Sequence, residues 1–101
     1  MIDRVVSKNG ISIRLTDERW AHIAEEHCEL APLRSMVVET VLHPQRILLG
    51  GEGELLAVRD VENGKSLVVV CREHANDGFI ITAFLTRRLR LWKRGGSYGH
   101  S

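Results

Sequence analysis

Hydrophobic and polar residues are patterned along this chain as in a small sheet preceded by helices. Two runs are rich in β-branched and aromatic residues, lie between turn residues and are too short for buried helices. They are residues 65–72 (KSLVVVCR) and 79–86 (FIITAFLT), and we expect them to form the two central strands. Residues 11–15 alternate between apolar and polar and predict a short edge strand, while residues 47–49 and 55–61 predict two more strands.

Two helices are predicted between the first strand and the others. Thr16 is a candidate N-cap, and acidic residues follow it in the first turn, where the helix dipole favours negative charge. At helical spacing, one apolar stripe then consists of Trp20, Ile23, Ala24, His27, Leu30 and Ala31. Pro32 suits the first turn of a second helix over residues 33–42, and Pro44 ends that helix. Its buried stripe is Leu33, Met36, Val37, Thr40 and Val41.

The dipeptide Asn63-Gly64 predicts a hairpin with a two-residue loop. Such a loop would pair Glu62 with Lys65 and place Arg59 opposite Val68. One face of the sheet would then hold Leu55, Ala57, Arg59, Val68, Val70 and Arg72. The other face would hold Leu56, Val58, Leu67, Val69 and Cys71. Because this second face is more apolar, we assign it to the helices.

Residues 76–78 (NDG) predict a three-residue hairpin loop whose glycine takes the left-handed conformation. In that register Arg72 lies opposite Thr82. The face away from the helices would then carry Arg59, Arg72, Thr82, Phe84 and Thr86. A loop of two or four residues would reverse the parity and turn Thr82 toward the helices.

These elements predict an α+β fold in which two N-terminal helices pack on one face of a curved, mostly antiparallel sheet of four or five strands. A chain of 101 residues suits one domain, which we place at residues 1–94, with residues 95–101 as a flexible tail. No apolar run approaches the roughly 20 residues of a membrane-spanning helix, and the N-terminus has no signal-peptide core. We therefore expect a cytoplasmic protein with no membrane contact. Cys28 and Cys71 are expected to be free buried thiols, with a disulfide between them as the alternative.

The net charge of +1 conceals an uneven distribution of charge along the chain. From residue 79 to the end, every charged side chain is basic: Arg87, Arg88, Arg90, Lys93 and Arg94. The first helical segment instead carries acidic residues. The basic block is either a phosphate-binding patch or a solvated tail.

The polar residues of the chain suit a metal-independent ribonuclease. Such an enzyme needs a base for the 2′-hydroxyl proton, an acid for the leaving 5′-oxygen, and donors for the charge on phosphorus. Histidine can transfer protons near neutral pH, and arginine offers a planar fork for two phosphate oxygens. We assign catalysis to His22, His27, Arg59 and Thr82, and substrate binding to Arg72, Thr86, Arg87, Arg88 and Arg90. No metal or cofactor is expected.

Each candidate also has a purely structural interpretation. His27 lies on the apolar stripe and could be a core histidine, while His22 could be an ordinary surface residue. Thr82 could be present for its strand propensity alone. A metal site built on the two helix histidines is disfavoured, because five residues place them about 140° apart around a helix.

The arginines and the remaining histidines have alternatives too. Arg59 and Arg72 could form a solvated pair with Glu73 or Asp60 on one sheet face. The other two histidines inside the predicted domain are interpreted as a helix-end residue, His43, and a loop residue, His74.

Four short motifs follow one another between Thr16 and Thr86. They are Arg19-Trp20-Ala21-His22-Ile23 with His27, His43-Pro44-Gln45-Arg46-Ile47, Leu67-Val68-Val69-Val70, and Phe79-Ile80-Ile81-Thr82-Ala83-Phe84. This pattern resembles the BECR nuclease-like superfamily of barnase, EndoU, colicin toxins and RelE, and in particular its small phage-associated and toxin-like members. The resemblance implies helices preceding a curved antiparallel sheet, and RNA cleavage without metal on the open face of that sheet. It matches the family's helix histidines to His22 and His27, its strand arginine to Arg59 and its last-strand threonine to Thr82.

We therefore expect an endoribonuclease of toxin type that acts on RNA such as tRNA or mRNA. Its protein partners would be an antitoxin or immunity protein and, in a homodimer, a second copy of the chain. Two other functions stay open. One is a non-catalytic module that binds RNA or a protein through the basic C-terminal segment, and the other is a structural protein of a phage or mobile element.

Overall fold

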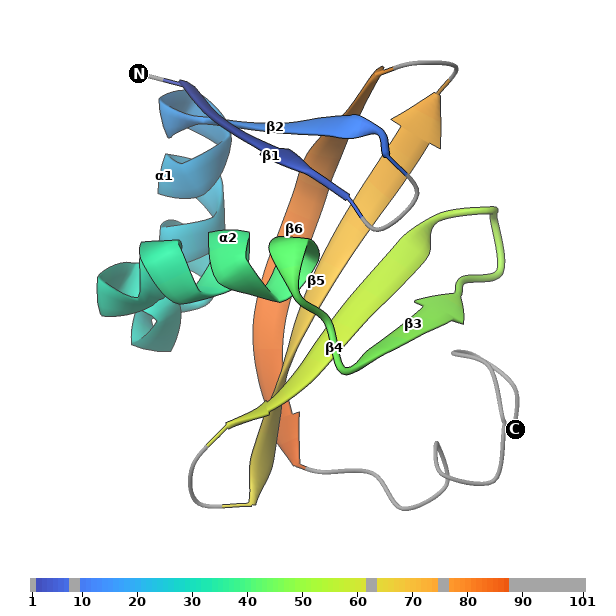
Figure 1. The fold of residues 1–101 in the computed structure, drawn as a ribbon. Coiled ribbons are helices and arrows are strands. Elements are labelled where there is room, and N and C mark those ends of the chain that lie inside the picture. The colour runs from blue at the N-terminus through green and yellow to red at the C-terminus, as the bar shows by residue number, and fades with distance from the viewer. Residues whose placement is uncertain (1, 8–9, 62–63, 75–76, 88–101) are drawn as a thin grey trace.

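The computed structural model describes residues 2–7, 10–61, 64–74 and 77–87. It has an α+β fold in which two α-helices pack on a curled, six-stranded sheet (Figure 1). In chain order the elements are β1 (Ile2–Val6), β2 (Ser12–Thr16), α1 (Asp17–Glu26), the 3-10 helix η1 (Cys28–Leu33), α2 (Arg34–Leu42), β3 (Arg46–Leu49), β4 (Leu55–Val61), β5 (Lys65–His74) and β6 (Asp77–Arg87). The predicted class and the order of the predicted elements are confirmed.

The strands are ordered β1-β2-β6-β5-β4-β3 across the sheet. Strand β2 pairs with β6 in parallel, whereas the other neighbouring strands are antiparallel. The prediction of four or five strands is wrong, because β1 adds a sixth strand that the sequence pattern did not reveal. For the same reason β2 is not the expected edge strand, since it lies between β1 and β6.

Helix α1 begins at the predicted N-cap. Oγ1 of Thr16 accepts a hydrogen bond from the backbone N–H of Arg19 at 3.0 Å. After α1 ends, the chain continues as η1, which contains Pro32, and α2 then begins at Arg34. The buried helix residues all belong to the two predicted stripes: Ile23, Leu30, Val37, Thr40 and Val41.

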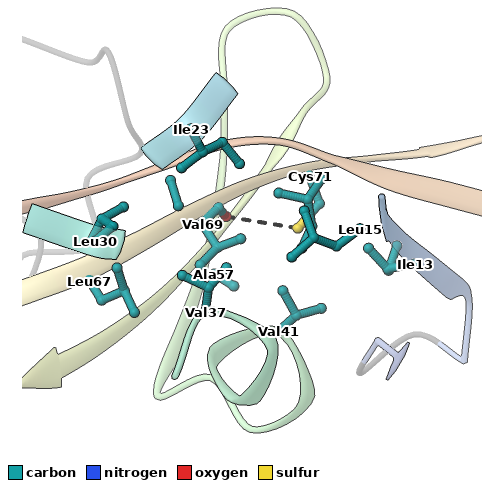
Figure 2. Packing of buried hydrophobic residues seen from close by; sticks show 12 residues of the cluster. Ile13, Leu15, Ile23, Leu30, Val37, Val41, Ala57, Leu67, Val69 and Cys71 are labelled. Atoms are coloured by element: carbon teal, nitrogen blue, oxygen red, sulfur yellow. Dashed lines mark hydrogen bonds between the residues drawn. The ribbon is translucent and has the colours of Figure 1, made fainter. Parts of the chain in front are cut away.

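Both helices cover one face of the sheet and close the main core on it (Figure 2). The buried members of this core are Ile13, Leu15, Ile23, Leu30, Val37, Val41, Ala57, Leu67, Val69, Cys71, Ile80 and Ala83. Thr40 is also buried, and its hydroxyl is satisfied by donating to the carbonyl of Met36 at 2.7 Å. We call this side of the sheet the helix-covered face and the opposite side the outer face.

The β4–β5 hairpin has a different register from the predicted one. Lys65 pairs with Val61, so three residues rather than two separate the paired positions, and Gly64 has a left-handed φ of 70°. Arg59 consequently lies opposite Leu67 and belongs to the helix-covered face. The prediction that Arg59 shares a face with Arg72 is therefore wrong. The expected partner of Lys65, Glu62, lies outside the described residues.

The expected assignment of apolar residues is correct for β5 but reversed for β4. Leu67, Val69 and Cys71 lie in the main core, as predicted. Leu56 and Val58 instead belong to a separate apolar cluster on the outer face. The physical reason is that a change of one residue in loop length turns every side chain of a strand to the other face.

The β5–β6 hairpin also starts differently. Asp77 pairs with His74, which leaves two residues between the paired positions, so Asp77 and Gly78 belong to β6. Gly78 does not have a positive φ, contrary to the prediction. It is needed for close packing instead, because a Cβ there would lie 2.6 Å from Cδ1 of Ile13 and 2.7 Å from the carbonyl oxygen of Arg72.

A bulge further along the same pair restores the predicted face of Thr82. The register shifts where Val70 pairs with Thr82 but Cys71 pairs with Ile80, which leaves Ile81 as the extra residue. Each of the two differences, the shorter loop and the bulge, reverses the parity once. Thr82 therefore faces outward as expected, but opposite Val70 rather than Arg72.

Three further expectations concern the cysteines, membranes and the C-terminus. Cys71 is a buried free thiol, as predicted, whereas Cys28 is free but exposed. Among the described residues there is no helix of the length and apolar character needed to cross a membrane. The proposed domain end at residue 94, the tail 95–101 and both Arg88 and Arg90 lie outside the described residues.

Candidate functional site

A row of three side chains crosses the outer face where β2, β6 and β5 meet. Arg14 of β2 pairs with Phe79 of β6, and Phe79 pairs with Arg72 of β5. Residues paired across strands point to the same side, and the chain neighbours Ile13 and Cys71 are buried in the main core, so all three point outward. Phe79 keeps 39% of its surface exposed. The outer face thus presents an exposed aromatic ring between two guanidinium groups.

Two recesses of about 180 Å³ each lie beside Phe79, and Arg14 lines both of them. The first is also lined by Arg19, which comes from α1, and the second by His74, at the end of β5. Arg19 brings a third guanidinium group to this region. His74 brings an imidazole group, a side chain that many enzymes use as a general base or acid.

Each of the three arginines is held by one contact that leaves further donors free. Nη2 of Arg14 lies 2.9 Å from Oδ2 of Asp77, Nη1 of Arg19 donates to the carbonyl of Ile81 at 3.4 Å, and Nη1 of Arg72 donates to the carbonyl of Glu52 at 3.3 Å. A guanidinium group has five N–H donors. Nε of Arg14 is buried, and the other remaining donors can bind the oxygens of a phosphate.

Carboxylates balance part of the positive charge of the row. Asp77 pairs with Arg14, as described. The pKa of Glu54 is held below its ordinary value, mainly by the backbone N–H of Glu52 at 2.9 Å, with a smaller effect from the charge of Arg72. A phosphate ligand would have to compete with these two carboxylates for the arginines.

His27 reaches the outer side of the sheet from the end of α1. It is half-buried at the C-cap position, and its ring lies 6.3 Å from that of Phe84 with an interplanar angle of 41°. Phe84 packs against the apolar cluster of the outer face, and Thr82 precedes it by two residues on the same strand face. The structure thus brings His27 and Thr82 to one side of the sheet, at the edge of β6.

The other predicted site residues are separated. Arg59 and Arg87 belong to the helix-covered face, while Thr86 pairs with Ser66 on the outer face. His22 is exposed on α1. The four expected catalytic residues do not converge on one cleft, because Arg59 and Thr82 lie on opposite faces of the sheet.

The β3–β4–β5 part of the outer face is occupied by structural contacts. Leu56, Val58 and Val68 are buried there with Leu48, Val70 and Phe84 packed against them. Beside them, Oδ1 of Asp60 accepts hydrogen bonds from Arg46 at 3.1 Å and from Ser66 at 2.8 Å. Asp60 thus pairs with Arg46 rather than with Arg59 or Arg72. The row of Arg14, Phe79 and Arg72 is accordingly the candidate site on this face.

The described residues offer neither a metal centre nor a reactive buried thiol. Nowhere among them do three or more His, Cys, Asp or Glu residues lie together as potential metal ligands. Burial, with a smaller effect from Glu73, raises the pKa of the Cys71 thiol from 9.0 to about 12. Its Sγ donates to the carbonyl of Val69 at 3.8 Å (Figure 2). Cys71 is therefore protonated and unreactive at neutral pH.

Arg14, Arg19 and Phe79 are not identified as site residues from the sequence, and His74 is interpreted there as a loop residue. One signal was present, since the alternation of Ile13 and Leu15 around Arg14 places that arginine opposite the apolar side. The pairing of Arg14 with Phe79, however, joins two distant segments in parallel, and no local pattern predicts such a contact.

Comparison of the chain with known proteins finds no matching family model, no matching curated protein and no matching solved structure. The candidate site therefore rests on its own geometry and chemistry.

Proposed function

We propose that this protein binds single-stranded RNA across the outer face and cleaves it without a metal ion, as a member of the BECR-like nucleases. The observation that carries the proposal is the row of Arg14, Phe79 and Arg72, with Arg19 and His74 lining the recesses beside the ring.

The composition of the row matches what single-stranded RNA requires of a sheet surface. Unpaired bases stack on exposed aromatic rings, and arginines beside the ring bind the phosphates that link those bases. Phe79 supplies the ring, and Arg14 and Arg72 lie on either side of it. A duplex would hide its bases from such a ring, so single strands are the expected ligand.

The cleavage step would use the recess beside Phe79 that Arg14 and His74 line. His74 takes the proton of the 2′-hydroxyl, the 2′-oxygen attacks phosphorus, and the bond from phosphorus to the 5′-oxygen breaks. The products are a 2′,3′-cyclic phosphate and a 5′-hydroxyl that receives a proton from water or from an acid. Arg14 and Arg72 bind the phosphate oxygens on which negative charge increases. Arg59 takes no part, because it belongs to the opposite face.

A second candidate is RNA binding without cleavage through the same row. The observation that favours it is the separation of Arg59 from Thr82, since the residue set implied by the family resemblance is not assembled. The two candidates share the ligand and differ in whether His74 has a chemical role.

The binding test uses fluorescently labelled single-stranded RNA, fluorescence anisotropy, chelator and a series of salt concentrations. We expect Phe79→Ala to weaken binding by about 1–3 kcal/mol, the usual value of a base stacked on an aromatic ring. Arg72→Gln should lower the salt dependence by about one phosphate contact. Arg59→Gln is the matched control on the other face and should bind as the wild type does. Absence of RNA binding by the wild type would refute the proposal.

The cleavage test follows the appearance of cyclic-phosphate ends in the same chelator-containing buffer. We expect cleavage by the wild type, loss of cleavage in His74→Ala, and unchanged RNA affinity in that variant. His27→Ala serves as the comparison, because His27 lies beside Phe84 rather than beside the row. Binding without any cleavage would leave the non-catalytic candidate as the function.

The toxin-type role is tested in cells. Expression of an active ribonuclease should arrest growth unless an inhibitor protein is present, and His74→Ala should relieve the arrest. Normal growth at high levels of folded wild-type protein would contradict this role.

A further inference from the structure

A pocket of about 500 Å³ opens on the helix-covered face, on the side of the sheet opposite the RNA row. Figure 1 shows that β4, β5 and β6 extend beyond the helices at one end of the sheet. The walls of the pocket include Leu33, Met36 and Glu39 from the helical layer and Arg59, Lys65 and Leu85 from the strands.

The strand wall of the pocket is basic. Arg59 and Lys65 both line this wall. Arg87 of β6 pairs with Lys65 of β5 and so adds a third basic residue beside the two. Within the part of the chain that the structure describes, neither Arg59 nor Lys65 forms an ion pair with a carboxylate. Two cations on one wall of a pocket, neither of them ion-paired within the described ranges, create a favourable position for an anion.

Two acidic residues, Glu39 and Asp60, also line the pocket, but neither forms an ion pair with Arg59 or Lys65 among the described residues. The Asp60 carboxylate accepts hydrogen bonds from Arg46 and Ser66 on the outer face. Glu39 is exposed on α2 and lies on the helical wall. The strand wall thus keeps its positive charge.

The rest of the pocket is apolar. Leu33 and Met36 come from the helical layer, and Val61 and Leu85 from the strands, and all four are partly buried against the main core. Volumes between roughly 300 and 1,000 Å³ with apolar walls and few polar groups are typical of sites for small molecules. The side chains therefore suit a ligand with one anionic end and an apolar body.

We propose that this pocket binds a small organic anion, a carboxylate or sulfonate on an apolar ring or chain. The anionic group contacts Arg59 and Lys65, and the apolar body packs against Leu33, Met36 and Leu85. The pocket and the row of Arg14, Phe79 and Arg72 lie on opposite faces of the sheet. The small ligand and the RNA would therefore not contact each other or compete for the same residues. The proposal does not depend on the RNA function.

The test is a titration of isotope-labelled full-length protein with 1-naphthalenesulfonate, followed by amide chemical shifts in NMR spectra. We expect saturable shifts at Val61, Lys65 and Leu85 and at the helical residues Leu33 and Met36. Uncharged naphthalene should bind at least about tenfold more weakly than the sulfonate, because it lacks the charge-assisted hydrogen bonds. Shifts confined to other regions, or equal affinity for the two probes, would overturn the proposal.

Variants then test the two cations separately. Lys65→Gln and Arg59→Gln should each weaken sulfonate binding by about tenfold. Lys65 is exposed, so its replacement should leave the fold intact even if the Arg59 variant does not fold. Arg72→Gln is the matched control on the outer face and should keep wild-type affinity for the sulfonate. The assignment would be overturned if Lys65→Gln and a folded Arg59→Gln variant both bound the sulfonate with wild-type affinity.

The two proposals fail separately. Absence of sulfonate binding with normal RNA binding contradicts only the proposal for the pocket. Absence of RNA binding with normal sulfonate binding contradicts only the proposal for the row.

Discussion

The two faces of the sheet present different kinds of residues. On the helix-covered face, β5 contributes Leu67, Val69 and Cys71 to a core closed by both helices. On the outer face the same strand contributes Val68 to a smaller cluster and then, beyond the bulge, places Arg72 beside Phe79. One strand thus contributes one set of alternate residues to the core and the other set to the proposed RNA-binding row.

This difference also shows where charge is tolerated. The centre of the helix-covered face is apolar, and its basic residues Arg59, Lys65 and Arg87 lie only at the end that extends beyond the helices. On the outer face, Arg14 and Arg72 lie at the other end of β5, next to the join with β2, while Arg46 forms a half-buried pair with Asp60 beside the apolar cluster. The basic residues of the helix-covered face therefore lie at its solvent-exposed end, whereas the outer face also holds one half-buried ion pair.

The largest effect should come from the helix-covered face. Leu67 is fully buried, so Leu67→Ala should lower the free energy of unfolding by about 2–5 kcal/mol in urea titrations, through lost burial and the cavity left behind. Leu49 is 57% exposed, and Leu49→Ala should change it by less than about 0.5 kcal/mol. A cost below about 1 kcal/mol for Leu67→Ala would mean that the helices do not close this core as described.

The second effect concerns Gly78, where the proposed RNA-binding row of Arg14, Phe79 and Arg72 adjoins the core. Gly78→Ala should lower the free energy of unfolding by about 1–3 kcal/mol, since the new Cβ would press on Ile13 and on the backbone of Arg72. It should also weaken RNA binding, because β2 and β6 must separate and Arg14 moves away from Phe79. Gly51→Ala is the control, as a Cβ there meets nothing within 4 Å. Equal stability of the two variants would contradict the close packing of β2 on β6.

The third effect is a pH dependence of the free energy of unfolding that comes from Cys71 on the helix-covered face. The folded-state pKa of Cys71 is raised from 9.0 to about 12, so the unfolded chain releases the thiol proton first as pH rises. The stability from this thiol is fully present below about pH 9 and is lost progressively toward pH 12, by about 1 kcal/mol at pH 10. Urea unfolding at pH 8 and pH 10 should show a smaller decline in Cys71→Ala than in the wild type. Because Cys28 is exposed, Cys28→Ala should keep the wild-type decline.

The smallest change in stability should come from the outer face. The Arg14–Asp77 pair is largely exposed, so Asp77→Asn should lower the free energy of unfolding by less than about 1 kcal/mol. It should nevertheless tighten RNA binding, since it frees Arg14 and removes a negative charge beside the phosphates. Asp17→Asn removes a comparable pair with Arg34 on the helices and should leave RNA affinity unchanged. If both variants bind RNA as the wild type does, Arg14 is not part of the RNA surface.

Local patterns in the sequence were sufficient for most elements of the fold. Helical spacing, the Thr16 cap and Pro44 predicted the helical layer and its buried stripes, because these signals act within a few residues. Pro32 was expected in the first turn of the second helix but lies in η1, and α2 begins at Arg34. The strands after the helices were predicted for the same reason, since β-branched runs bounded by turns are local signals. Strand β1 was missed, as its sequence IDRVV lacks a clear alternation.

The candidate site was predicted only in part. Arg72 and Thr82 were correctly expected on the face away from the helices. Arg59 was expected there too but lies on the helix-covered face. The dipeptide Asn63-Gly64 is compatible with a loop of two or three residues, and the choice between them decides the face of the whole of β4. For Thr82, the shorter loop and the bulge at Ile81 compensated each other, so that prediction was confirmed for an incomplete reason.

By itself the sequence determined which segments become helices and strands and which of their residues are apolar enough to be buried, because these properties depend on neighbours along the chain. Only the tertiary structure decided which charged residues meet. The row of Arg14, Phe79 and Arg72 joins three strands across the sheet, and its alignment depends on the parallel pairing of β2 with β6 and on one extra residue in β6. Strand registers of this kind are set by the packing of the whole sheet against its helices, and a single residue of slip would send the same side chains to the opposite face.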